Sequence, residues 1–171
     1  IGIASLGYAV PGTVIAVGVL IPIASLDNQI DFLSRTWFDY PTGLLLSGTL
    51  GILVFAYLVR FLSIALNTVD SGLISIKPNL DESARSLGAS PGKVLRRIHL
   101  PILRTSLLTA LLLVFVEVLK ELPTTLILRP FNFNTLAVRT YELASDERLM
   151  DAALPALAIV IIGLLPVLLI T

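Results

Sequence analysis

Four long apolar runs separated by polar loops constrain the fold of this chain more than any other feature. A helix needs about 20 mostly apolar residues to cross a bilayer, and each run is that long or nearly so. The two-residue alternation of transmembrane barrels is missing, and helices satisfy their own backbone hydrogen bonds in lipid. The sequence therefore predicts an all-α, polytopic transmembrane helical bundle with spans over about 11–26, 44–66, 104–128 and 152–171.

Composition agrees with a membrane protein. The chain is 56% hydrophobic and 14% charged, whereas soluble domains carry about 25% charged residues. A net charge of zero gives no case for nucleic-acid binding, and the lack of cysteine excludes disulfides and thiolate metal sites. Because the chain starts at Ile1 and ends inside an apolar run at Thr171, we expect one transmembrane domain, 1–171, that is a fragment of a longer chain.

Basic residues predict the orientation, because cytoplasmic loops carry an excess of lysine and arginine. Six of them lie between Asn67 and Arg104, and only one lies between Asp27 and Gly43. We therefore predict that the middle loop is cytoplasmic and that the first and third loops are outside. Arg60 lies within the second span, and its long side chain is expected to snorkel to the inner headgroups.

The middle loop, 79–101, carries local signals for a first short helix over 80–87. Asn79 with Glu82 three residues later predicts a capping box at its start. Gly88 predicts a left-handed residue at its end. The helix carries small residues on one face, so another protein could approach it closely.

A second short helix is predicted after a tight turn. Ser90 is a suitable N-cap, Pro91 suits the first helical position, and Pro101 is expected to end the helix before the next span. A basic loop that only sets the topology would need no such fold. We therefore interpret the loop as a docking element for a soluble partner, with a solvated topology signal as the alternative.

The same stretch resembles the EAA loop of ABC importer permeases. Glu82-Ser83-Ala84 is followed after three residues by Gly88, and after nine more by Ile98-His99-Leu100-Pro101. The one departure from the pattern is Ser83 in place of alanine. In that family the first helix of the loop is a coupling helix that lies in a groove of a cytoplasmic ATPase. The resemblance implies an ATPase contact made by Glu82, Ser83, Ala84, Arg85, Gly88 and Ala89.

Later segments resemble the ferric-iron branch of these permeases, and in particular its C-terminal half. The segments are KELPTTLILRP at 120–130, LAVR at 136–139 and ASDER at 144–148. This resemblance implies a multi-pass protein of the bacterial inner membrane that imports ferric iron. Sulfate, thiamine and phosphonate importers share the EAA loop, so these substrates stay open.

The resemblance also implies partners. They are a cytoplasmic ABC ATPase dimer that binds ATP and Mg²⁺, a periplasmic substrate-binding protein, and a second permease half, fused or separate. No cofactor is expected on this chain itself.

Three charged residues near the end of the third span, Glu117, Lys120 and Glu121, have the spacing i, i+3 and i+4. That spacing predicts one shared helical face in the outer half of the bilayer. Ionisable residues at such depth usually face a bundle interior or a water-filled cavity. We consider a polar lining of the translocation path and a self-neutralising cluster that holds helices together.

The third loop predicts a turn at 132–134 and a short helix from Thr135 to Ala144. A lid, a docking surface for the binding protein and a passive interfacial helix are all compatible with it.

No catalytic or metal-ligating constellation is visible. The sequence has no GxxxxGK[ST] phosphate loop, so ATP would bind to a partner. No metal-ligand spacing occurs, and His99, the only histidine, is expected to be structural. We therefore expect a permease subunit that is not an enzyme. A secondary transporter and an intramembrane enzyme are the rival interpretations, and neither explains the helical middle loop.

Overall fold

The computed structural model describes residues 6–170, which form helices and loops without a strand in that range. Four helices within it are long and apolar enough to cross a membrane, with α5, η1 and α6 counted as one continuous helix. The elements are α1 (Leu6–Ala9), α2 (Gly12–Phe38), α3 (Leu50–Ile74), α4 (Pro78–Ser86), α5 (Pro91–Val94), the π-helical η1 (Leu95–His99), α6 (Leu100–Leu119), α7 (Pro123–Leu128), α8 (Leu136–Ser145) and α9 (Leu149–Ile170).

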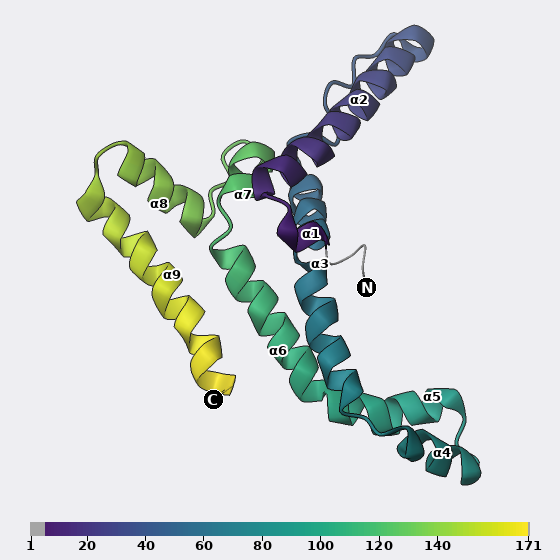
Figure 1. Cartoon of the computed structure of the whole chain (residues 1–171). Coiled ribbons are helices and arrows are strands. Elements are labelled where there is room, and N and C mark those ends of the chain that lie inside the picture. Colours follow the sequence, from purple (N-terminus) through teal and green to yellow (C-terminus); the bar gives the residue numbers. More distant parts are fainter. Residues whose placement is uncertain (1–5, 171) are drawn as a thin grey trace.

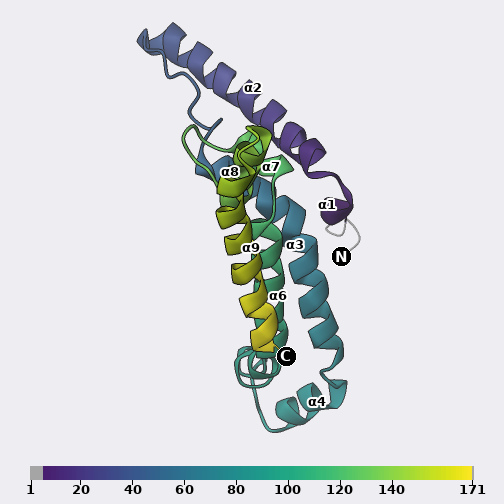
Figure 2. The same ribbon diagram turned by 90° about the vertical axis from the view of Figure 1, so that its left-hand side faces the viewer.

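Three of the long helices run side by side. α3 descends to the α4–α5 loop, α6 returns antiparallel to it, and α9 packs along α6 (Figures 1 and 2). The loop of α4 and α5 therefore lies at one end of the bundle, and α7 and α8 lie at the other. α2 instead projects obliquely beyond the α7 end (Figure 1).

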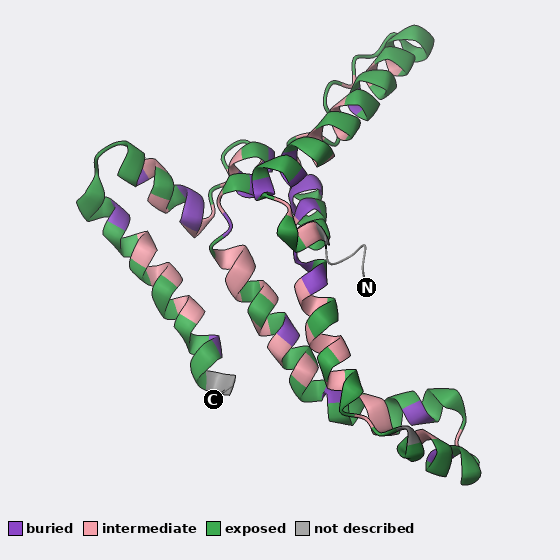
Figure 3. Cartoon of the chain, viewed as in Figure 1, coloured by how far each residue is buried: buried purple, intermediate pink, exposed green. Residues whose placement is uncertain are grey.

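The apolar core lies where the first half of α2, the start of α3 and α7 meet. Elsewhere the long helices carry mostly exposed apolar side chains (Figure 3), as expected for helices that are covered by lipid or another subunit. The core residues are Ile15, Ala16, Ile52, Leu53, Ala56 and Leu128.

The first two predicted spans, 11–26 and 44–66, differ from the observed helices. α2 continues to Phe38, because the loop that follows it folds back and bonds to its side chains. The buried carboxylate of Asp27 accepts the backbone N–H groups of Leu45, Leu46 and Ser47 at 3.2, 2.9 and 2.7 Å. α3 consequently starts at Leu50, after the loop.

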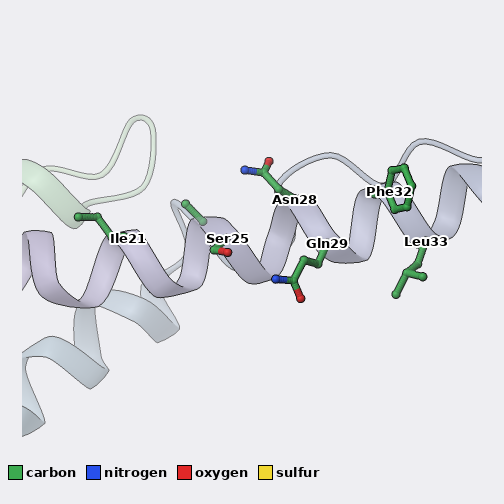
Figure 4. A pocket seen from close by; sticks show the side chains of 7 residues that line it. Ile21, Ser25, Asn28, Gln29, Phe32 and Leu33 are labelled. Carbon is green, nitrogen blue, oxygen red and sulfur yellow. The ribbon is translucent and has the colours of Figure 1, made fainter.

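The middle of α2 has a shallow hollow along it, which Figure 4 shows from close by. Its lining mixes apolar and polar side chains, unlike the core side of the same helix. The lining residues are Ile21, Ala24, Ser25, Asn28, Gln29, Phe32 and Leu33.

The prediction of one span over 104–128 was wrong at its end. α6 ends at Leu119, and a separate helix, α7, starts at Pro123. A continuous helix would need a Pro123 N–H to bond the Leu119 carbonyl, and proline has none. The proline instead occupies the first position of α7, where no N–H is required.

The prediction that Pro101 ends the loop helix was also wrong. The helix runs from Pro91 through η1 into α6, and the N–H of Leu100 bonds the carbonyl of Leu95, five residues earlier. This wider turn directly precedes Pro101 and accommodates a residue that has no N–H. Single π turns of this kind are frequent at functional sites.

The local signals of the loop were confirmed in part. Gly88 has the left-handed φ of 77°, and Ser90 and Pro91 hold the N-cap and first positions of α5. The prediction of a capping box was wrong, because α4 starts two residues earlier than the box requires, at Pro78, with Lys77 as its N-cap. In the third loop, the predicted helix is α8, with Thr135 as its N-cap.

Candidate functional site

The predicted docking residues lie on α4 and in the turn after it. Glu82, Ser83 and Arg85 are exposed, whereas Ala84 is buried at 9% exposure and faces the rest of the chain. The buried alanine departs from the expected pattern, since it leaves the charged and hydroxyl side chains as the outward face of α4.

Gly88 and Ala89 close the helix by backbone bonds. The N–H of Gly88 bonds the Arg85 carbonyl at 2.9 Å, and that of Ala89 bonds the Ala84 carbonyl at 3.0 Å. The second bond spans six residues, which is the pattern of a glycine-terminated helix. Gly88 is exposed and Ala89 is half-buried, so the turn itself is available to a partner.

One side-chain contact ties α4 to the helix that enters the bundle. His99 Nε2 lies 2.7 Å from Asp81 Oδ1, and the two side chains are 20% and 33% exposed. His99 is the last residue of η1, directly before α6. The expected structural role of the histidine thus has a specific partner.

Arg60 and Glu121 form a buried ion pair inside the bundle. Arg60 Nε lies 3.4 Å from Glu121 Oε2, and the side chains are only 17% and 6% exposed. The prediction that Arg60 snorkels to the headgroups was therefore wrong. The break after α6 turns Glu121 toward α3, which gives the arginine a partner within the protein.

Glu121 also anchors α7 and α2. Its Oε1 accepts the backbone N–H of Thr124 at 3.1 Å and lies 2.6 Å from Thr124 Oγ1. The same hydroxyl lies 3.2 Å from the carbonyl of Gly12 at the start of α2. A second hydroxyl, on Thr125, donates to the Glu121 carbonyl at 2.8 Å and lies 2.5 Å from the Tyr57 hydroxyl on α3. We call Gly12, Tyr57, Arg60, Glu121, Thr124 and Thr125 the polar junction.

The junction is tightly packed around Gly12. A Cβ at this position would lie 2.1 Å from Arg60 Nη1, 2.6 Å from Thr124 Oγ1 and 2.7 Å from Glu121 Oε1. Among the described residues, Arg60 Nε and Nη1 have no hydrogen-bond partner. The charge of Glu121 is therefore the main compensation for a buried guanidinium.

The other two predicted path residues lie apart from the junction. Lys120 Nζ pairs with Glu117 Oε1 at 2.8 Å, and these side chains are 56% and 23% exposed. The expectation of one face for all three residues was wrong, because the helix ends before Lys120. The sequence analysis did not predict Glu121 as the partner of Arg60. The available sign was that Arg60 is the only charged residue in the predicted second span, where a charge needs a partner.

A polar network holds the segment between α7 and α8 to α8. Glu142 accepts from Arg129 Nη2 and from Asn134 Nδ2, each at 3.0 Å, and Arg129 also bonds Asn134. Within residues 6–170, no group of three or more His, Asp or Glu side chains is placed to hold a metal ion.

Four long apolar helices, with a helical loop between the second and third of them, have the architecture of a multi-pass membrane domain. The chain belongs to the family of binding-protein-dependent transport system inner membrane components, which it matches over residues 2–171. It is therefore a multi-pass protein of the inner membrane.

Curated relatives carry two kinds of name. The chain is 29% identical to the Fe(3+)-transport system permease protein FbpB 2 of Haemophilus influenzae, over 94% of this chain and 28% of that protein. It is 27% identical to the ferric transport system permease protein FbpB of Actinobacillus pleuropneumoniae, over 81% of this chain and 20% of the relative. It is 32% identical to the putative 2-aminoethylphosphonate transport system permease protein PhnV of Salmonella typhimurium, over 70% of this chain and 45% of the relative. The chain thus spans less than half the length of these relatives.

Proposed function

We propose that this chain is the membrane-spanning part of an ATP-driven importer that carries ferric iron into the cytoplasm. The observation that carries the proposal is a compact, glycine-closed helix, α4, which presents Glu82, Ser83 and Arg85 outward at one end of the bundle. Exposed charge and small side chains on a short rigid helix suit a groove on a soluble partner. Family membership supports the same function.

The partners follow from this proposal. A pair of cytoplasmic ATPases, which hold ATP and Mg²⁺, binds α4, and a substrate-binding protein delivers the substrate at the α7–α8 end. A second permease half completes the pathway, and the chain itself performs no chemistry.

Ferric iron is proposed as the substrate because the ferric relatives align over 94% and 81% of the chain. The phosphonate relative aligns over 70% but is slightly more identical, at 32%. 2-Aminoethylphosphonate is therefore the second candidate. Uptake of labelled ferric iron that excess 2-aminoethylphosphonate does not reduce would favour the first, and the opposite competition would favour the second.

The transport step is a rigid-body switch. Closure of the ATPase pair moves α4, and the motion passes through α5 and η1 into α6, since these form one continuous helix. Glu117 and Lys120 at the far end of α6 are proposed to line the path, because their side chains are less buried than Glu121. Glu121 is held by Arg60 and serves the fold.

Glu82→Lys and Gly88→Pro test the docking role. Each variant is expected to reach the membrane in normal amount, to lose the ATPase on co-purification and to lose uptake. Gly92→Ala is the matched control, because a Cβ there meets nothing within 4 Å and the backbone is not left-handed. Normal ATPase binding and uptake in both test variants would contradict the proposal.

A further inference from the structure

We propose that Asp81 and His99 are positioning residues of the transport cycle, which together fix the orientation of α4 relative to α6. The inference rests on the proposed docking role of α4 and adds the contact through which α4 acts on the bundle.

The two residues join elements with different roles. Asp81 lies in the first turn of α4, and His99 is the last residue before α6. Their side chains meet at 2.7 Å in a half-buried position. A hydrogen bond to a charged group in such a place contributes more than an exposed ion pair does.

Other side-chain bonds of α4 stay within the helix. Ser83 Oγ donates to the Asn79 carbonyl, and Ser86 Oγ donates to the Glu82 carbonyl. Among the residues that the structure describes, the Asp81–His99 contact is the one side-chain bond between α4 and the helix that continues into α6.

The contact sets which face of α4 points outward. Asp81 and the buried Ala84 are three residues apart and so share one face. Holding that face against the bundle presents Glu82, Ser83 and Arg85 to the partner, and makes α4 and α6 move as one body.

Removing the link should uncouple ATP hydrolysis from transport. In the assembled transporter in proteoliposomes, His99→Ala and Asp81→Ala are expected to keep the ATPase bound and active. Iron imported per ATP hydrolysed should fall about tenfold, the ratio expected when one charged-group hydrogen bond is lost. Lys93→Ala is the control, because this exposed side chain lies in the same loop and should leave the ratio unchanged.

Rescue separates positioning from general damage. The reversed pair, Asp81→His with His99→Asp, restores a bond between the same positions and should recover most of the ratio. His99→Gln keeps a hydrogen-bond donor and should lose less than His99→Ala. These comparisons hold even if a single variant folds poorly, because a variant with the bond restored would regain both yield and coupling.

Two results would overturn the inference: an unchanged ratio of iron to ATP in both alanine variants, or no recovery in the reversed pair. Release of the ATPase by His99→Ala would also overturn it, since the contact would then serve docking. Failure of the docking proposal would give a different result from failure of this inference. If α4 is not the docking element, Glu82→Lys and Gly88→Pro would leave ATPase binding intact.

Discussion

The polar junction and helix α4 differ in how their polar side chains are held: those of the junction are buried and bonded to several elements, whereas those of α4 are mostly exposed. In the junction, buried hydroxyl, carboxylate and guanidinium groups link α2, α3 and α7 through several bonds. The α4 helix is mostly exposed and has one side-chain bond to the helix that continues into α6. A segment with few buried contacts moves at a lower free-energy cost than a buried network.

The two regions therefore have different mechanical roles in the same bundle. The junction fixes three segments relative to one another, and α4, linked to the helix that continues into α6 by the Asp81–His99 contact, is the element that a partner can displace. A rigid-body switch needs both, because a displaced helix transmits motion only when part of the bundle resists it.

The largest expected effect comes from removing one charge of the junction. Glu121→Ala leaves the Arg60 guanidinium buried without its partner, which should lower the free energy of unfolding by about 3–5 kcal/mol. Thermal unfolding in detergent measures it. The double variant Arg60→Leu with Glu121→Leu should recover most of the loss, and Glu117→Ala should cost at most about 1 kcal/mol. Equal stability of Glu121→Ala and the wild type would show that the polar junction does not hold the bundle together more firmly than the exposed helix α4 does.

A single methyl group tests the packing of the junction. Gly12→Ala would place a Cβ 2.1 Å from Arg60 Nη1, and overpacking of this kind costs about 1–3 kcal/mol. Gly18→Ala in the same helix is the control, because nothing lies within 4 Å of its Cβ, and alanine there should stabilise by about 0.5–1 kcal/mol. Gly12→Ala should therefore lower the melting temperature, and Gly18→Ala should raise it. A shift in the same direction for both variants would contradict the tight packing around Gly12.

Tyr57→Phe removes one hydroxyl from the junction. Thr125 then loses the partner at 2.5 Å, and a lost buried hydrogen bond costs about 1 kcal/mol. Tyr141→Phe, on a ring that is 48% exposed, should change the unfolding temperature little. An equally small shift for both variants would show that the Tyr57 hydroxyl is not held.

The smallest stability effect is expected from Lys120→Gln. Its ion pair with Glu117 is more than half exposed on the lysine side, and such pairs contribute about 0–1 kcal/mol. If these residues line the path, uptake should change while the melting temperature does not. A stability loss as large as that of Glu121→Ala would place Lys120 in the structural network instead.

Local features could be predicted from the sequence, and distant ones could not. Gly88 and Ser90 act on their own backbone neighbourhood, so residue type and spacing were sufficient to predict their positions at the end of α4 and the start of α5. The Arg60–Glu121 pair depends on how α3 meets the break after α6, and no local pattern encodes that meeting. Pro123 was the available sign of the break, but the apolar run around it favoured one continuous span.

Amide hydrogen exchange on the permease, with and without its ATPase, tests the contrast between the two regions most directly. Amides of α7 and of the start of α2 should be protected in both states, whereas amides of α4 should exchange fast alone and slowly when the ATPase is bound. Protection of α4 that equals that of α7 without the ATPase, or that does not change when the ATPase binds, would contradict the account.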